Sequence, residues 1–195
     1  AQLQAYAAMR ALTELGHPCE IIDYRPDYDA GLNDLFRRGG VRAQLSNAHT
    51  AAHYAALKRR WERFDAFVDE HMALTRKRYT SYEQLCQDPP DCDVYVAGSD
   101  QIWNPAIYPG GRFDPAYLLG FVKEGRRISY APSMGSRPFT PEEAEELRAA
   151  LAPFSALSVR EEAGRDAVRA AAGREPTVVL DPTLLLRADQ WGELA

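Results

Sequence analysis

Short apolar segments alternate with helical segments in the second half of the chain, and this alternation limits the fold more than any other feature. Each apolar segment is bounded by Gly, Pro, Ser or Asp, as β-strands commonly are. Strands that are joined through helices pair in parallel and are covered by helices on both faces. The sequence therefore predicts an α/β fold with a Rossmann-like parallel sheet. The predicted strands are residues 93–97, 127–131, 156–159 and 177–180, and the predicted helices between them are residues 141–151 and 161–172.

The helix predicted over residues 141–151 has a clear start signal. Thr140 precedes Pro141, and Glu143 follows three residues after the threonine. In a capping box, the threonine hydroxyl accepts a hydrogen bond from the third helical residue, whose side chain accepts one from the threonine N–H. Proline suits the first helical position because an N–H there has no partner inside the helix. We predict a capped helix that begins at Pro141.

The chain before Pro89 and Pro90 follows a different pattern. Helical periodicity over residues 3–12 stops at Gly16, and residues 19–24 predict a strand. Residues 25–52 show little periodicity, after which helical spacing returns with one apolar and one charged face. That apolar face consists of Leu57, Trp61, Phe64, Val68 and Met72.

These patterns predict one Rossmann-like domain over residues 1–195 that contains a helical or irregular insertion at about residues 27–90. The chain opens inside a helical pattern and closes where another helix begins, so we expect the domain to be truncated at both ends.

Composition excludes several classes of protein. The 195 residues carry 23 basic and 28 acidic side chains, a net charge of −5, which argues against a general nucleic-acid binder. No apolar run approaches the roughly 18 residues that a membrane-spanning helix needs. The spacing of Cys19, Cys86 and Cys92 matches no zinc or redox motif and is typical of reduced thiols. We expect a soluble, cytoplasmic protein.

Candidate functional residues follow the predicted strands, because ligands of open parallel sheets bind at the carboxyl ends of the strands. Glycine and serine at such ends let the backbone approach a ligand closely, and an arginine there suits a carboxylate or a phosphate. The candidates are Ser99, Asp100 and Gln101 after the first of these strands, Ser133 and Gly135 after the second, Arg160 after the third and Asp181 after the fourth.

Each charged candidate also has a structural interpretation. Asp181 precedes Pro182 and Thr183, a pattern that favours a turn with an aspartate cap over chemistry. Asp100 opens a wide polar and aromatic loop, and function and turn formation are equally compatible with it. Arg160 needs an anionic partner at the end of a buried strand, either a ligand or a neighbouring glutamate, Glu161 or Glu162.

Other signals are weaker. His49 and His53 have the spacing of a metal pair, but Thr50 stands where a zinc protease has its glutamate, so we favour a solvated pair. The basic side chains within residues 58–78 are interleaved with acidic ones, which is typical of a solvated helix face. Dinucleotide, P-loop and hydrolase motifs and metal clusters are missing from the sequence, so no cofactor or metal is predicted.

Several segments, taken together and in order, resemble the polysaccharide pyruvyl transferase family. The most distinctive strings are Gly-Ser-Asp-Gln-Ile-Trp-Asn at residues 98–104 and Ser-Val-Arg-Glu at residues 158–161, and Pro132 and Met134 are mild departures from the family pattern. The resemblance runs nearly end to end, over residues 4–16, 21–26, 93–105, 128–135, 157–161 and 179–185.

The resemblance implies that the chain is the first half of a GT-B-like fold with its active site between two Rossmann-like halves. A glycine-rich loop is then expected upstream of Ala1, and a C-terminal domain beyond Ala195 would supply much of the phosphoenolpyruvate site. The chain alone would be inactive. The implied partners are therefore phosphoenolpyruvate, a saccharide acceptor and the C-terminal domain of the same protein.

The implied reaction moves the pyruvyl group of phosphoenolpyruvate onto two sugar hydroxyls in exopolysaccharide or cell-surface polysaccharide biosynthesis, giving a ketal. It needs an acid for the enol carbon, a base for a hydroxyl and cations for the donor. We assign Arg160 to the donor and Asp100 to acceptor orientation or deprotonation, while Ser99 and Gln101 position the acceptor and Ser133 and Gly135 complete the substrate site.

Two alternatives stay open. One is a GT-B-like glycosyltransferase that uses a nucleotide-sugar, because fold alone does not separate these enzymes. The other is a non-catalytic relative that binds a sugar or a partner protein through the insertion.

Overall fold

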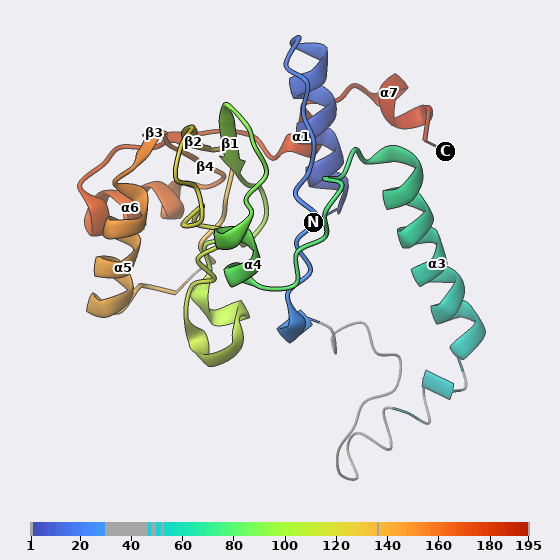
Figure 1. Ribbon diagram of the computed structural model, residues 1–195, viewed down its shortest axis with the longest axis horizontal. Helices are drawn as coiled ribbons and strands as arrows, with labels where there is room; N and C mark the ends of the chain where they lie inside the picture. The colour runs from blue at the N-terminus through green and yellow to red at the C-terminus, as the bar shows by residue number, and fades with distance from the viewer. Residues whose placement is uncertain (1, 30–46, 48–49, 52, 136, 195) are drawn as a thin grey trace. The chain divides into compact units, whose positions relative to one another are not determined.

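The computed structural model describes residues 2–29, 47, 50–51, 53–135 and 137–194, and its elements are drawn in Figure 1. The chain divides into two compact units. One unit combines residues 1–19 with residues 82–195, and the other consists of residues 20–81. The first unit contains the strands described below, and each unit is taken by itself.

The first unit is a mixed α/β structure with parallel strands, as the alternating pattern predicts. β1 (Val94–Ala97), β2 (Arg126–Ser129) and β3 (Phe154–Ala156) form one parallel sheet in that order. β4 (Ser158–Val159) and β5 (Thr177–Val178) form a parallel pair. β3 and β4 are separated only by Leu157, so the predicted strand over residues 156–159 exists as two short pieces of one extended segment.

Two buried serines join β2 to β4 through their side chains. The Ser129 hydroxyl donates to the Ser158 carbonyl (2.9 Å) and accepts from the Ser158 N–H (3.0 Å). The Ser158 hydroxyl donates to the Ser129 carbonyl (2.7 Å). These bonds replace the backbone ladder that is interrupted here, and they satisfy polar groups that would otherwise be buried without partners. The carboxyl ends of β2 and β4 are thereby held next to each other.

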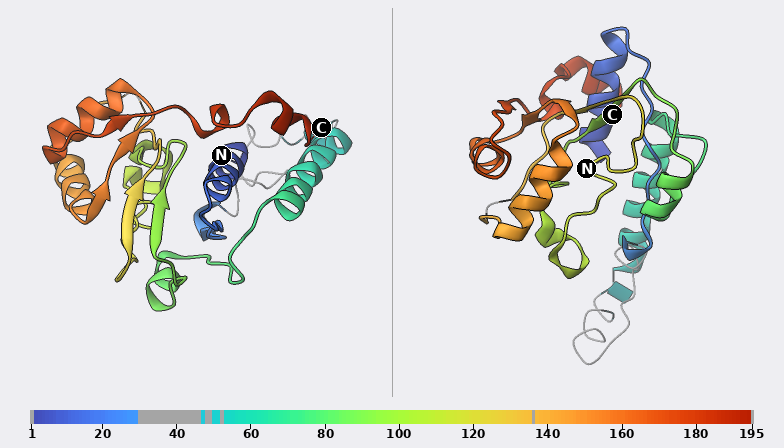
Figure 2. Two further views of the ribbon diagram at one scale, coloured as in Figure 1. Left: turned by 90° about the horizontal axis from the view of Figure 1, so that it is seen from above. Right: turned by 60° about the vertical axis from the view of Figure 1, so that its left-hand side comes forward.

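Two long helices pack together beside the strands. α5 (Pro141–Leu151) buries Leu147 and Leu151, and α6 (Glu162–Ala172) buries Val168. The two helices contact each other. Figure 1 and the view from above in Figure 2 show α5 and α6 on one side of the strands and α1 (Gln2–Glu14) on the other side.

The connection between β1 and β2 is anchored by an aromatic core. Trp103 is fully buried, lies edge-on to Phe154 with ring centroids 5.9 Å apart, and donates from Nε1 to the Tyr117 carbonyl. The polar and aromatic loop that opens with Asp100 therefore packs on the sheet itself. This connection contains two short 3-10 helices, η2 (Pro105–Ile107) and η3 (Pro109–Gly111), and the short helix α4 (Tyr82–Gln87) precedes β1.

The segment after β5 packs against α1. It contains the 3-10 helix η4 (Pro182–Leu184) and α7 (Ala188–Gly192), the helix predicted at the end of the chain. The rings of Tyr6 and Trp191 lie 5.9 Å apart, and Gln190 donates to Glu14. α1 thus reaches the end of β5 although it stands at the opposite end of the sequence.

The second unit holds a buried carboxylate between two arginines. Asp23 Oδ1 accepts from Arg25 Nε (2.6 Å) and Asp23 Oδ2 from Arg78 Nε (2.8 Å). Burial raises the pKa of Asp23, but the hydrogen bonds from Arg78 and Arg25 outweigh burial and hold that pKa below its usual value. The predicted strand over residues 19–24 appears only as single parallel bridges, Ile21 with Leu74 and Tyr24 with Tyr79.

The second unit also contains α3 (Tyr54–His71) and the 3-10 turn η1 (Asp27–Asp29). Of the five residues of the predicted apolar face, only Val68 is buried, and Trp61 and Phe64 are 36% and 37% exposed.

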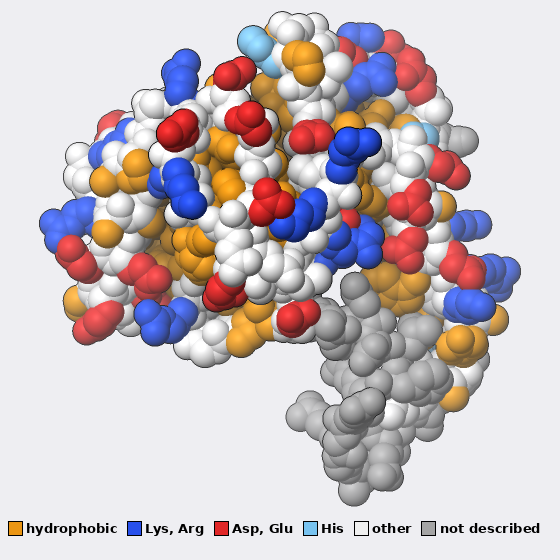
Figure 3. Space-filling view, in the orientation of Figure 1, with side chains coloured by type: hydrophobic (Ala, Val, Ile, Leu, Met, Phe, Trp, Pro, Cys, Tyr) orange, Lys and Arg blue, Asp and Glu red, His pale blue; other side chains and the backbone are white. Residues whose placement is uncertain are grey.

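No helix in the described ranges is long and apolar enough to cross a membrane. Figure 3 shows Lys and Arg side chains scattered among Asp and Glu on the face drawn, as the interleaved sequence predicts.

The predicted capping box of α5 is present. The Thr140 hydroxyl accepts from the Glu143 N–H, and the Glu143 carboxylate accepts from the Thr140 N–H at 2.8 Å. Arg137 also donates to this carboxylate, and its hydrogen bonds lower the pKa of Glu143 against the opposing effect of burial.

We expect Thr140→Ala to lower the free energy of unfolding by about 1 kcal/mol, because one N–H of the first turn loses its acceptor. Urea unfolding followed by circular dichroism measures this loss. Thr140→Ser, which keeps the hydroxyl, is the matched control and should change the free energy little. Equal losses in the two variants would show that the hydroxyl does not cap α5.

Candidate functional site

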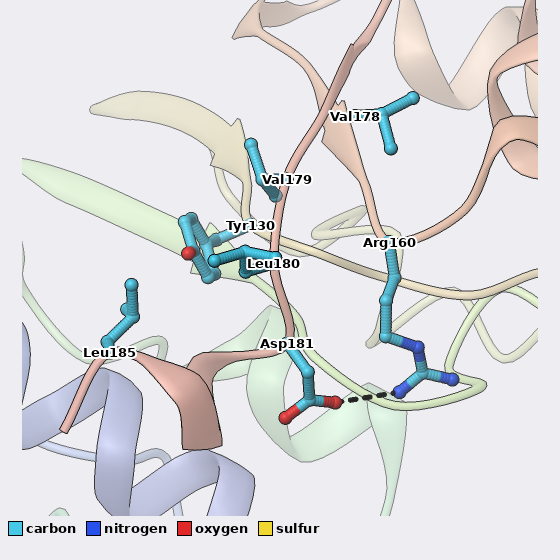
Figure 4. A pocket seen from close by; sticks show the side chains of 7 residues that line it. All are labelled: Tyr130, Arg160, Val178, Val179, Leu180, Asp181 and Leu185. Carbon is cyan, nitrogen blue, oxygen red and sulfur yellow. Dashed lines mark hydrogen bonds and ion pairs between the residues drawn. The ribbon is translucent and has the colours of Figure 1, made fainter. Parts of the chain in front are cut away.

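A pocket of about 490 Å³ lies where β2, β4 and β5 end. Tyr130 directly follows β2, Arg160 directly follows β4, and Val179 directly follows β5. This is the edge at which ligands of parallel sheets bind. The lining residues, drawn in Figure 4, are Tyr130, Arg160, Val178, Val179, Leu180, Asp181 and Leu185.

Arg160 and Asp181 form the charged part of the pocket. Arg160 Nη1 lies 3.2 Å from Asp181 Oδ2, and the two side chains are 24% and 23% exposed. Figure 4 shows them pointing toward each other from neighbouring strand ends. Arg160 Nε also lies 3.4 Å from the carboxylate of Glu161. Of the two glutamates weighed as partners from the sequence, Glu161 therefore contacts Arg160, whereas Glu162 pairs with Arg165.

The Asp181 carboxylate binds donors from three elements. Its Oδ1 accepts from the backbone N–H of Thr183 (3.0 Å) and from the Thr183 hydroxyl (2.7 Å). Its Oδ2 accepts from Gln4 Nε2 of α1 (2.5 Å) and from Arg160. Burial raises the pKa of Asp181, but these hydrogen bonds outweigh burial and keep the pKa below its usual value. Asp181 thus caps η4, as its sequence context predicts, and also carries a charge into the pocket.

Tyr130 and the aliphatic residues give the pocket an apolar wall. Burial raises the pKa of the Tyr130 phenol, and the negative charge of Asp181 raises it further. The phenol therefore stays neutral near pH 7. A neutral hydroxyl beside aliphatic side chains and an ion pair can contact both apolar and polar groups of a ligand.

Asp100 lies on a neighbouring loop with an unusual backbone. Asp100 and Ala131 follow adjacent strands, and both have positive φ, 77° and 54°, a region that residues with a side chain rarely adopt. The Asp100 carbonyl accepts from the Ser133 N–H (2.7 Å), and the Arg160 N–H donates to the Pro132 carbonyl (3.2 Å). The segment of Pro132 and Ser133 therefore runs between the backbones of Asp100 and Arg160.

Three other predicted site residues make hydrogen bonds within these loops. Gln101 Oε1 accepts from Asn104 Nδ2 (2.8 Å), and a Cβ on Gly135 would stand 2.5 Å from that same nitrogen. The Gly135 N–H lies 3.4 Å from the Ser133 hydroxyl. Asn104, which was not a candidate, thus packs closely against Gly135 of the loop after β2.

Ser99 differs from these residues. Its side chain is buried, with 7% of the residue exposed, and its hydroxyl has no hydrogen-bond partner among the residues that the structure describes. A buried hydroxyl without a partner is costly, which makes Ser99 a candidate for contact with a ligand or a water molecule.

The structure separates the predicted residues into two groups. Arg160 and Asp181 line the pocket, whereas Ser99, Asp100, Gln101, Ser133 and Gly135 belong to the adjoining loops and do not line it.

Sequence reasoning missed Tyr130 and Gln4. The position of Tyr130 at a strand end could have indicated it, whereas Gln4 lies 177 residues from Asp181 and no local pattern could have connected the two.

The described part of the chain contains no group of three or more His, Cys, Asp or Glu that could hold a metal ion. His49 of the weighed histidine pair lies outside the described residues. The three cysteines, all within the described ranges, form no disulfide with one another.

Comparison with known families decides the relationship that the motifs suggest. The family model described as polysaccharide pyruvyl transferase matches residues 1–195. The chain belongs to the polysaccharide pyruvyl transferase family. No curated protein and no solved structure matched the chain in the same comparisons.

Membership of the polysaccharide pyruvyl transferase family identifies the general activity as that of a transferase with a saccharide acceptor. Within the chain, the pocket and the loops beside it contain both distinctive strings, the one that carries Asp100 and the one that carries Arg160. The carboxyl edge of the strands is therefore the candidate active site of this family member.

We expect Gly98→Ala to destabilise this protein more than Gly173→Ala does. Both glycines have positive φ, 145° and 63°, but a Cβ on Gly98 would stand 1.8 Å from the Tyr130 carbonyl oxygen, whereas nothing lies within 4 Å of a Cβ on Gly173. Gly173→Ala should cost about 1–2 kcal/mol from its backbone conformation alone. Urea unfolding of both variants gives the comparison, and similar losses would contradict the close approach of the two loops.

Proposed function

We propose that this protein transfers the pyruvyl group of phosphoenolpyruvate onto two hydroxyls of a saccharide. The phosphoenolpyruvate CH2 gains a proton and becomes a methyl group, the two sugar oxygens bond to the neighbouring carbon, and phosphate leaves with the remaining proton. The product is a cyclic ketal that carries a carboxylate. The observation that supports this proposal most is the guanidinium of Arg160 in a pocket at the strand ends of a member of this family.

Arg160 is the residue that we assign to the donor. Phosphoenolpyruvate carries a carboxylate and a phosphate, and an arginine binds either through paired N–H groups. The carboxylates of Asp181 and Glu161 take Nη1 and Nε, and Nη2 has no hydrogen-bond partner among the described residues. Gln4 and Thr183 also donate to Asp181, so its carboxylate has hydrogen-bond partners besides Arg160.

Asp100 is the residue that we assign to the acceptor, as the base that removes or orients a hydroxyl proton. It stands on the loop next to the pocket, and its Oδ1 accepts a hydrogen bond from the Gln101 N–H at 2.8 Å. Ser99 and Gln101 would position the sugar, and Ser133 and Gly135 would line its path. The unsatisfied hydroxyl of Ser99 supports the first of these assignments.

The wider setting is also a proposal. The parallel strands and their flanking helices suit the Rossmann-like first half of a GT-B-like enzyme, with residues of about 27–90 as an insertion and a C-terminal domain that completes the donor site. We place the reaction in exopolysaccharide or cell-surface polysaccharide biosynthesis in the cytoplasm, with no cofactor besides the donor substrate.

Phosphoenolpyruvate should raise the melting temperature of the full-length protein, because a ligand at 100 times its Kd adds about 2.7 kcal/mol to stability. Arg160→Ala should weaken the binding of phosphoenolpyruvate about 10- to 100-fold, since a hydrogen bond to a charged group is lost. Arg148→Ala, which removes an exposed arginine of α5, is the control. Stabilisation by nucleotide-sugars instead of phosphoenolpyruvate would favour a glycosyltransferase.

Asp100→Asn should lower kcat for pyruvyl transfer by about 10²- to 10⁴-fold, because the amide keeps the shape of the carboxylate but does not take a proton. Steady-state kinetics with phosphoenolpyruvate and a saccharide acceptor measures this effect. Asp91→Asn changes an exposed carboxylate of the same unit and should leave kcat unaltered. Full turnover by Asp100→Asn would exclude acid–base chemistry at this residue.

A further inference from the structure

The two oxygens of the Asp181 carboxylate accept hydrogen bonds from different parts of the structure. Oδ1 accepts from the N–H and the hydroxyl of Thr183, within its own turn. Oδ2 accepts from Gln4 and Arg160, which come from α1 and from the end of β4. The bonds at Oδ1 fix the carboxylate independently of Arg160, and Oδ2 is left to act on the guanidinium.

Arg160 depends on such fixed contacts for its direction. An arginine side chain is long and flexible, and its planar group recognises an anion through two N–H bonds only when the plane is correctly oriented. Asp181 accepts from Nη1 at 3.2 Å, and Glu161 lies 3.4 Å from Nε. Glu161 is the weaker guide of the two, because its contact is longer and its side chain is more exposed, 33% against 23%.

Gln4 restrains the second oxygen. Its amide Nε2 donates to Oδ2 at 2.5 Å, a contact between α1 and the segment that follows β5. The carboxylate therefore does not rotate freely about its side-chain bond, because both of its oxygens are held. An anion that binds Arg160 meets a guanidinium whose plane is already set.

We propose that Asp181 is a positioning residue that sets the direction of the Arg160 guanidinium for the donor, with Gln4 holding the oxygen that does so. This inference rests on the proposed function, in which Arg160 binds phosphoenolpyruvate. Asp181 itself does not touch the donor. Its effect is on the affinity of the enzyme for phosphoenolpyruvate and passes through Arg160.

Asp181→Asn separates this role from capping. Asparagine caps a helix as well as aspartate does. Its amide oxygen takes the place of Oδ1, where the Thr183 N–H requires an acceptor, so its NH2 group takes the place of Oδ2 and faces the donors Gln4 and Arg160. Gln4 can turn its own amide to accept a hydrogen bond, but Arg160 cannot accept one. The cap survives, and the contact with Arg160 is lost.

We expect Asp181→Asn to raise KM for phosphoenolpyruvate about ten-fold and to leave KM for the saccharide nearly unchanged. Thr183→Val is the matched control, because it removes the hydroxyl donor at Oδ1 and leaves Oδ2 untouched. It should lower the melting temperature and leave KM for phosphoenolpyruvate unchanged. Asp181→Ser, which also caps a helix but is too short to reach Arg160, is a second variant with the same expected rise in KM.

The double variant that combines Asp181→Asn with Arg160→Ala distinguishes the positioning role of Asp181 from the binding role of Arg160. If Asp181 acts through Arg160, Asp181→Asn has no further effect on KM once Arg160 is alanine. A ten-fold effect that persists in that background, or an unchanged KM in Asp181→Asn when Arg160→Ala raises it, would overturn the positioning role. If Arg160→Ala itself leaves KM for phosphoenolpyruvate unchanged, the assignment of Arg160 in the proposed function fails instead.

Discussion

The hydrogen bonds between Ser129 and Ser158 determine where the candidate site of this protein forms. Both serines are buried, and their hydroxyls connect β2 to β4 where the backbone ladder is interrupted. Because these bonds hold the strand ends in line, Tyr130 and Arg160 emerge at the same edge. The pairing of β4 with β5 then places Asp181 beside them. A pocket with an apolar wall and an ion pair is the direct result.

The charges of Arg160 and Asp181 are compensated by several hydrogen-bond and ion-pair partners rather than by each other alone. Arg160 faces two carboxylates, and one of them, Asp181, also receives hydrogen bonds from Gln4 and Thr183. Breaking a buried ion pair is costly because it leaves an uncompensated charge. An ion pair in which each member has other partners can lose one contact and still keep both charges compensated. The guanidinium is thus available to an anionic ligand while its neighbours stay satisfied.

The parts of the structure that local patterns control could be predicted from the sequence. The α5 capping box and the aspartate cap at Asp181 depend on residues close together in the chain. The strands of the second half are visible as short apolar segments, and their parallel pairing is expected from the helical segments that alternate with them. The strand predicted at residues 19–24 forms only isolated bridges, because its partners are the single residues Leu74 and Tyr79 rather than a second regular strand. The spacing of the apolar residues of α3 indicates a buried face, but only Val68 of that face is buried. Burial depends on neighbouring elements, which the spacing does not reveal.

From its sequence Asp181 is expected to cap a turn rather than to take part in chemistry, and in the structure its carboxylate both caps η4 and contacts Arg160. A carboxylate has two oxygens, and a short 3-10 turn needs only one of them. The other oxygen can then face the end of a neighbouring strand, where Arg160 stands, and receive a donor from α1. A cap at the carboxyl end of a strand is therefore suited to orient a neighbouring side chain such as Arg160, since its own position is fixed by a bond to the backbone of its turn.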